Sequence, residues 1–218
     1  MAIVATAPRI ATLQPSARLA RLKASPRKPG EASFFWYETQ FGNEAVKVLP
    51  GEYFVDDEDI LIMTTLGSCI AACLWDREAR IGGLNHFMLP EGDGDSGRYG
   101  SYAMELLINE MLKRGASRPS LEAKIFGGGQ VIAGMETMNV GERNTRFVLD
   151  YLQTERIPVV SRDVLDIYPR KVCFFPASGK AMVKRLATAN AATLAARERA
   201  AATRILPAST GGGSVDLF

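Results

Sequence analysis

Short runs of apolar and β-branched residues recur between positions 59 and 186, and polar segments with turn residues separate them. Runs of this length and composition are typical of β-strands. We therefore expect strands at 59–66, 68–76, 81–89, 123–128 and 157–164. Two further apolar runs flank the turn-rich segment 176–179, which predicts a β-hairpin over 170–186.

Two longer segments have the 3.6-residue periodicity of amphipathic helices. The first is 101–115, with apolar side chains on one side at Met104, Leu107, Ile108, Met111 and Leu112. The second is 144–155, with Phe147, Leu149, Tyr151 and Leu152. Strands and two helices, in a chain long enough for one substantial core, predict a single-domain layered α/β sandwich.

The two ends of the chain differ from this central part in composition. Residues 1–30 hold six basic side chains, four prolines and no acidic residue, which favours a disordered basic arm over an organelle transit peptide. Residues 189–218 are rich in alanine, which favours helix, and then in glycine and serine, so we expect a flexible tail. The predicted folded domain comprises residues 31–188.

Charge and composition exclude several classes of protein. The 218 residues carry 26 basic and 24 acidic side chains, but without residues 1–30 the balance is 20 to 24. A mildly acidic domain argues against a nucleic-acid-binding surface. No apolar run reaches the roughly 20 residues of a membrane-spanning helix. Three cysteines do not suggest a disulfide framework, so a reducing cytoplasm is the expected location.

Cys69 and the single histidine, His86, lie in neighbouring predicted strands. The polar segment 76–79 predicts an antiparallel hairpin in which Asp76 pairs with Ala79, and Cys69 then stands directly opposite His86. Side chains opposite each other point to the same face, with β-carbons about 4.5–5.5 Å apart. Because an imidazole at that distance can generate the reactive thiolate, Cys69 and His86 are candidate catalytic residues.

Three other interpretations of these residues remain open. Cys69, Cys73, Cys173 and His86 make a Cys3His set acceptable for zinc, although Cys69 and Cys73 in one strand are about 13 Å apart. Ser68 and His86 could form a serine hydrolase pair, but strand alternation points Ser68 away from His86. Finally, Cys69 can be a core residue, as we expect of Cys73 and Cys173.

The stretch FGGGQVIAG, residues 126–134, superficially resembles a phosphate-binding loop. It lacks the Gly-Lys-Ser/Thr ending that such a loop needs. We interpret the glycines as a turn or as a place where two backbone segments approach closely.

Seven motifs occur together between residues 51 and 186. They are GEYFV (51–55), TTLGSCIAAC (64–73), GGLNHFMLP (82–90), KIFGGG (124–129), NVGERN (139–144), RIPVV (156–160) and RKVCFFPASGKAMVKRL (170–186). In this order they resemble the CheD family of bacterial chemotaxis, and LGSC followed by NHFMLP and FGG is the specific part. The chain departs from the family at Leu165-Asp166, where a glycine pair is common.

The resemblance implies a fold related to the cytotoxic-necrotizing-factor deamidase toxins and a Cys-His-Thr catalytic set. This set carries over to Cys69, His86 and one of two threonines. Thr64 fits the T-x-LGSC form by position, whereas Thr65 has the strand parity of Cys69. The implied enzyme is a protein-glutamine deamidase, an amidohydrolase that converts chemoreceptor glutamines to glutamate through a thioester, with methylesterase side activity chemically plausible.

Such a reaction needs donors for the oxyanion of the tetrahedral intermediate, and the backbone N–H groups of Gly67 and Ser68 are the candidates. No metal or organic cofactor is required. The implied partners are the cytoplasmic helices of chemoreceptors and, in some lineages, a CheC-type phosphatase, with no nucleic acid and no membrane insertion. The alternative is a non-catalytic adaptor that binds receptors or a phosphatase and keeps Cys69 and His86 as core residues.

Overall fold

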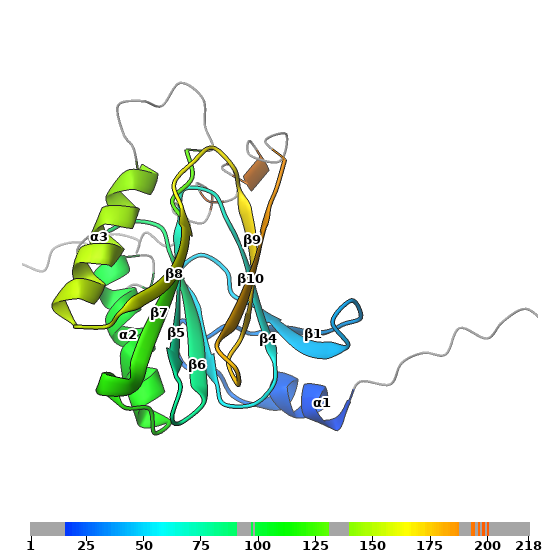
Figure 1. The fold of residues 1–218 in the computed structure, drawn as a ribbon. Coiled ribbons are helices and arrows are strands. Elements are labelled where there is room, and N and C mark those ends of the chain that lie inside the picture. Colours follow the sequence, from blue (N-terminus) through cyan, green and yellow to red (C-terminus); the bar gives the residue numbers. More distant parts are fainter. Residues whose placement is uncertain are drawn as a thin grey trace, which may run out of the picture.

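Two five-stranded sheets face each other, and helices cover the outer side of one of them (Figure 1). The computed structural model describes residues 16–90, 97, 99–130 and 140–187, together with positions 193, 194, 196, 198 and 200. The predicted single-domain layered α/β sandwich is thereby confirmed. No helix in the described parts of the chain is both long and apolar enough to cross a bilayer.

The helix-covered sheet has the strand order β3-β6-β5-β7-β8. Its strands are β3 (Tyr53–Asp56), β5 (Ile70–Asp76), β6 (Ile81–Phe87), β7 (Leu121–Gly127) and β8 (Val159–Val164). All neighbours are antiparallel except β7 and β8, which are parallel. This parallel pair requires a crossover connection, which contains helix α3 (Val140–Thr154).

The second sheet has the order β1-β2-β4-β9-β10. Its strands are β1 (Phe34–Glu38), β2 (Asn43–Lys47), β4 (Leu61–Leu66), β9 (Arg170–Phe175) and β10 (Lys180–Arg185). Strands β9 and β10 form the hairpin predicted around 176–179. Only β2 and β4 pair in parallel.

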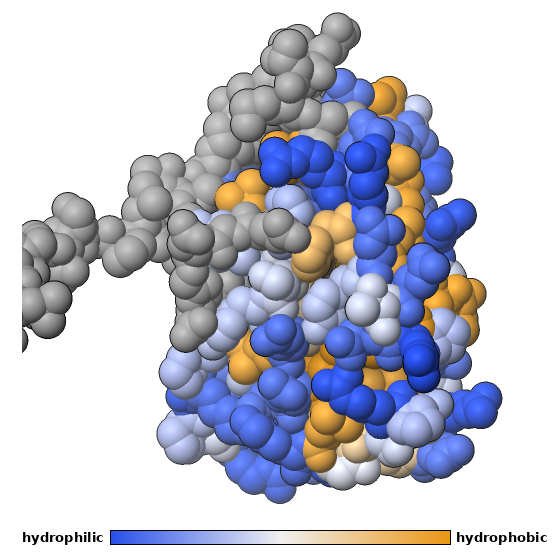
Figure 2. All heavy atoms as spheres, turned by 90° about the vertical axis from the view of Figure 1, so that its left-hand side faces the viewer, coloured by the Kyte–Doolittle hydropathy of each residue, from blue (hydrophilic) through white to orange (hydrophobic). Residues whose placement is uncertain are grey.

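Helices α2 (Gly100–Lys113) and α3 confirm the two helices expected from periodicity, although α3 begins four residues earlier than expected. Their apolar side chains pack on the helix-covered sheet, where Met104, Leu107 and Leu152 are fully buried. The side of the molecule that carries these helices is mostly hydrophilic, with smaller apolar areas between (Figure 2). The short 3-10 helix Arg118–Ser120 leads into β7.

Strand alternation in β5 separates two cores. Ile70, Ala72 and Leu74 face the helices, whereas Cys69, Ala71 and Cys73 face the second sheet. Both sides are buried, so the strand is an almost continuous apolar run rather than an alternating one. Side chains at odd-numbered positions of this strand, like that of Cys69, therefore point into the space between the two sheets.

The expectation of a disordered arm over residues 1–30 is wrong from residue 16 onward. Helix α1 (Ala17–Ala24) begins at Ser16, whose side chain accepts a hydrogen bond from the backbone N–H of Leu19 at 3.0 Å. Leu19 is buried against the sheet core, while Arg18 pairs with Glu58 at 2.9 Å. The sequence analysis missed this short amphipathic helix because it considered only the average composition of residues 1–30. Residues 1–15 lie outside the described residues.

The predicted register of the β5–β6 hairpin is wrong by two residues. Asp76 pairs with Ile81, and His86 therefore stands opposite Ala71 instead of Cys69. The Asp76 carboxylate accepts hydrogen bonds from the backbone N–H groups of Glu78 and Ala79, which stabilises a longer, four-residue turn. Because the error is an even number of residues, Cys69 and His86 still share a face.

Leu165 and Asp166 occupy a turn that favours glycine. Both have positive φ, 64° and 68° respectively, at the position where the sequence departs from the family's glycine pair. The turn is held in place because the N–H of Leu165 donates to the Gly127 carbonyl at 2.9 Å and that of Gln130 donates to the Asp166 carbonyl at 2.7 Å. A left-handed backbone costs a residue other than glycine roughly 1–2 kcal/mol.

We predict that Leu165→Gly increases the free energy of unfolding by about 0.5–1 kcal/mol, because relief of the left-handed strain exceeds the backbone entropy that glycine adds to the unfolded chain. Leu165 is 40% exposed, so little apolar burial is lost. Urea denaturation measures the change. Ile167→Gly is the matched control, exposed but without positive φ, and it should destabilise. Equal destabilisation by both variants would contradict the strain at Leu165.

Candidate active site

The candidate catalytic side chains meet between the two sheets, and they come from both of them. Thr64 belongs to β4 of the second sheet, His86 belongs to β6, and Cys69 directly precedes β5. All three are at most 2% exposed. The grouping therefore exists only when the two sheets are packed together.

Thr64 fixes which nitrogen of His86 carries the proton. The Thr64 hydroxyl lies 2.8 Å from the Val48 carbonyl and 2.9 Å from Nδ1 of His86. A hydroxyl has one proton, and a carbonyl can only accept, so that proton is donated to Val48. Nδ1 of His86 must then donate to the hydroxyl oxygen, which leaves Nε2 as an unprotonated acceptor.

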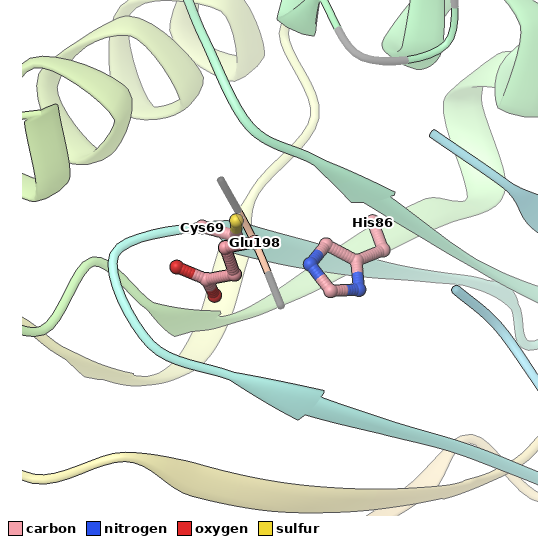
Figure 3. A group of neighbouring side chains, drawn as sticks. All are labelled: Cys69, His86 and Glu198. Atoms are coloured by element: carbon pink, nitrogen blue, oxygen red, sulfur yellow. The ribbon is translucent and has the colours of Figure 1, made fainter. Parts of the chain in front are cut away.

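Nε2 of His86 is buried and has no hydrogen-bond partner among the described residues. The imidazole faces Cys69 and Glu198 (Figure 3). Sulfur, ring nitrogen and carboxylate oxygen of these three residues lie within 4.8 Å of one another. A base with a free lone pair therefore stands beside a thiol.

Both members of the Cys69–His86 pair are neutral in this structure. Burial lowers the pKa of His86 to about 4, although the negative charge of Glu198 acts in the opposite direction. Burial also raises the pKa of the Cys69 thiol well above its ordinary value, and the charge of Glu198 and its hydrogen bond raise it further. A neutral thiol beside a neutral imidazole is the arrangement in which the imidazole acts as general base.

Glycines hold the turn that carries Cys69 against the end of β7. The N–H of Gly128 donates to the Cys69 carbonyl and that of Gly129 to the Gly67 carbonyl, each at 2.8 Å. Gly127 and Gly128 have positive φ, and a Cβ at Gly127 would lie 2.1 Å from the Cys69 carbonyl oxygen. The glycine stretch is thus the close backbone approach that the sequence indicated.

Asn144 of α3 anchors the same turn from the other side. Its Nδ2 donates to the Ser68 carbonyl at 3.1 Å and to the Met88 carbonyl at 2.8 Å, and the side chain is fully buried. With the contacts to Gly128 and Gly129, all three carbonyls of residues 67–69 have fixed donors. This orients the peptide groups of the turn.

The N–H groups of the turn hold a carboxylate. Gly67 N lies 2.7 Å from one oxygen of Glu198, and Ser68 N and Oγ lie 3.2 and 3.0 Å from the other. Gly67 and Ser68 are the two residues that the sequence nominated as oxyanion donors. Glu198 is only 7% exposed, so this part of the C-terminal segment does not have the flexible-tail character expected for residues 189–218.

The other residues singled out from the sequence lie elsewhere. Thr65 follows Thr64 in β4, so its side chain points to the opposite side of the strand, and only the Thr64 hydroxyl reaches His86. Cys73 is buried between the sheets, as expected of a core residue. Cys173 packs on the outer face of the second sheet, so the Cys3His zinc set is not assembled.

Three important residues escaped the sequence analysis. Glu198 lies 130 residues from Ser68 in an alanine-rich segment, and nothing in its spacing points to the site. Asn144 is part of the motif NVGERN, but an asparagine in a sequence does not indicate that its amide will bind backbone carbonyls elsewhere in the chain. Arg170 is fully buried and donates to Asp163, to the Tyr168 carbonyl and to the Leu165 carbonyl.

A metal ion has one candidate location among the described residues. Thiolate, imidazole and carboxylate are all zinc ligands, and Cys69, His86 and Glu198 bring one of each together. However, both oxygens of the carboxylate already accept hydrogen bonds from the turn 67–69. The donor set is therefore better suited to a carboxyl or amide group than to a cation.

Sequence comparison identifies the family of this chain. Residues 88–185 match the family model described as CheD chemotactic sensory transduction. A probable chemoreceptor glutamine deamidase CheD 1 of Albidiferax ferrireducens is 63% identical over 99% of this chain and 93% of its own length. A probable chemoreceptor glutamine deamidase CheD of Thiobacillus denitrificans is 53% identical over 86% of this chain and 96% of its own length.

This chain belongs to the CheD family. The level of identity, sustained over nearly the whole chain, leaves no other assignment. Among solved structures, the hypothetical protein YfiH of Bacillus licheniformis is similar over 53% of this chain and 49% of its own, with 11% identity and a TM-score of 0.35. That likeness is too low to support a statement on fold or function.

The buried imidazole predicts a pH dependence of stability. Since His86 has a pKa of about 4 when folded and about 6.5 when unfolded, the unfolded chain binds the extra proton between these values. The free energy of unfolding that neutral His86 contributes is therefore fully present above pH 6.5 and is lost as the pH falls to 4. We expect wild type to lose about 3 kcal/mol relative to His86→Gln between pH 7 and pH 4.

Urea denaturation at a series of pH values measures this difference. His86 is the only histidine, so the variant removes the only imidazole while all carboxyl groups remain as controls. Stability curves of wild type and His86→Gln that run parallel from pH 7 to pH 4 would contradict the depressed pKa.

Proposed function

We propose that this protein is a chemoreceptor glutamine deamidase, in which Cys69 is the nucleophile and His86 the base. The observation that carries the proposal is the unpartnered Nε2 of His86 beside the Cys69 thiol, with Nδ1 held by Thr64. The names of the 63% and 53% identical relatives support the same substrate.

The first half of the proposed reaction forms a thioester. Nε2 of His86 takes the thiol proton as Sγ of Cys69 attacks the carboxamide carbon of a receptor glutamine. The tetrahedral intermediate then breaks its C–N bond, and the nitrogen leaves as ammonia with the proton from His86. The product is a γ-glutamyl thioester on Cys69.

The second half consumes water. Nε2 of His86 takes a proton from a water molecule that attacks the thioester carbon, the C–S bond breaks, and the proton returns to sulfur. Glutamate and the free thiol result, so the net change is amide plus water to carboxylate plus ammonium. Because a γ-glutamyl methyl ester can enter the same thioester, we include methylesterase side activity in the proposal.

The N–H groups of Gly67 and Ser68 are the proposed oxyanion donors in both halves. They support this role because they already bind the carboxylate of Glu198 at 2.7 and 3.2 Å, the range needed for an oxyanion. Thr64 is a positioning residue, which acts by holding His86 in the tautomer that leaves Nε2 free.

The proposal places the protein in the cytoplasm, where it would act on the cytoplasmic helices of membrane-bound chemoreceptors. A CheC-type phosphatase is a second proposed partner. The rival candidate, a non-catalytic adaptor, needs no hydrogen-bonded Thr64–His86 pair beside a thiol and no N–H groups directed at a carboxyl group, and the site contains both.

The deciding experiment incubates a chemoreceptor cytoplasmic fragment from the same cell with this protein and follows amide-to-acid conversion by mass spectrometry. We expect conversion at defined glutamines, no detectable conversion by Cys69→Ala, and a rate roughly 100- to 10,000-fold lower with His86→Gln. Cys173→Ala, on the far face of the second sheet, is the control that should stay active. A folded wild type that binds the fragment without converting it would support the adaptor.

Thr64 offers a finer test of the same mechanism. Thr64→Val removes the acceptor for Nδ1, and the loss of one buried hydrogen bond of about 1–1.5 kcal/mol should lower kcat roughly 10-fold with little change in KM. Thr64→Ser keeps the hydroxyl and should restore most of the rate. If Thr64→Ser is as slow as Thr64→Val while both remain folded, the hydroxyl is not the positioning group.

A further inference from the structure

Glu198 occupies the candidate active site although it lies far from it in sequence. The described positions of the segment around it, 193, 194, 196, 198 and 200, are helical, and the segment lies next to the sheets (Figure 1). The Glu198 side chain lies beside Cys69, with its carboxylate on the side away from His86 in this view (Figure 3), and one carboxylate oxygen lies within 4.8 Å of the thiol sulfur and an imidazole nitrogen. Glu198 belongs to neither of the two sheets nor to helices α1 to α3, and its side chain makes hydrogen bonds rather than apolar contacts. Its position in the site therefore requires a separate explanation.

The carboxylate of Glu198 is bound in a way that suits a reacting carboxyl or amide group. Its partners are the N–H groups of Gly67 and Ser68 and the Ser68 hydroxyl, which are neutral donors. Among the described residues no lysine or arginine forms an ion pair with it, although buried carboxylates are usually paired. The Gly67 N–H group can equally donate to the carbonyl oxygen of a glutamine, whose NH2 group can donate to the Ser68 hydroxyl oxygen.

The chemistry of the side chain matches the proposed reaction. Deamidation converts glutamine to glutamate, and Glu198 therefore carries the group that the reaction produces, within 4.8 Å of the thiol and the imidazole. Directly beside it in sequence stand Arg197 and Arg199. Among the described positions 193, 194, 196, 198 and 200, only Glu198 is buried, so the contact with the site is made by this one side chain.

We propose that the C-terminal helical segment of this chain is an internal ligand of the active site, with Glu198 bound as a reaction product would be. The site consequently accepts a glutaminyl or glutamyl side chain presented by a helical segment, and this segment must leave before a receptor glutamine can enter. This inference rests on the proposed deamidase function.

Glu198 also controls the nucleophile while it is bound. Its negative charge and hydrogen bond add to burial in raising the pKa of the Cys69 thiol. When the segment leaves, the thiol becomes more accessible and loses a nearby negative charge, so that thiolate forms more readily. While Glu198 is bound, the same contact thus keeps the substrate out of the site and lowers the reactivity of the Cys69 thiol.

The first test makes the internal ligand a substrate. In the Glu198→Gln variant, an amide replaces one oxygen without a change in length, and Cys69 should convert residue 198 back to glutamate. Mass spectrometry of the purified variant is expected to find the acid at position 198, and the amide in Cys69→Ala/Glu198→Gln. Glu105→Gln, an exposed substitution on α2, is the matched control and should keep its amide.

The second test measures release. Glu198→Ala should be alkylated at Cys69 by iodoacetamide, and should deamidate the receptor fragment, roughly 10-fold faster than wild type if the segment occupies the site for nine-tenths of the time. Glu105→Gln should match wild type in both assays. Conversion of Glu198→Gln at a rate independent of protein concentration identifies the contact as one within a single chain.

The outcomes separate this inference from the proposed function. If wild type converts receptor glutamines while Glu198→Gln keeps its amide and Glu198→Ala is no faster, the internal ligand is refuted and the deamidase stands. If folded protein converts neither the receptor glutamines nor residue 198 of Glu198→Gln, both the internal ligand and the deamidase function are refuted. Stoichiometric zinc in wild type that is lost in Glu198→Ala would also overturn the inference, because Glu198 would then be a metal ligand.

Discussion

The contact between two backbone segments determines the geometry of this site. The turn at residues 67–69 lies so close to the glycines at the end of β7 that a side chain at Gly127 would collide with it, and two N–H···O hydrogen bonds join the two segments. Asn144 secures the remaining carbonyl of the turn. With its carbonyls directed outward, the turn presents its N–H groups inward beside the thiol, which is the preorganisation that acyl-transfer chemistry requires.

Much of the fold could be predicted from local patterns because the apolar runs and helical periodicities carry it. The strands around Cys69 and His86, helices α2 and α3 and the β9–β10 hairpin all follow from such patterns. The exact hairpin register did not, because it depends on the Asp76 carboxylate capping its own turn. The shared face of Cys69 and His86 survived this error, since alternation depends only on parity.

Long-range contacts explain what the sequence could not show. The choice between Thr64 and Thr65 depends on which face of β4 is turned toward the other sheet, a property of sheet packing. Glu198 and Leu19 were overlooked for a related reason. Each lies in a segment whose average composition suggests a tail, whereas burial of a single side chain decides where the segment lies.

The chain contains one histidine, and that residue is the proposed base of the candidate site. Its two ring nitrogens differ in protonation because Thr64 holds one of them. In a nitrogen magnetic resonance spectrum of 15N-labelled protein, the two imidazole signals therefore belong to one ring and need no assignment to a residue. Tautomer, protonation and occupation of the site can be followed through this pair of signals, in the intact protein and during turnover.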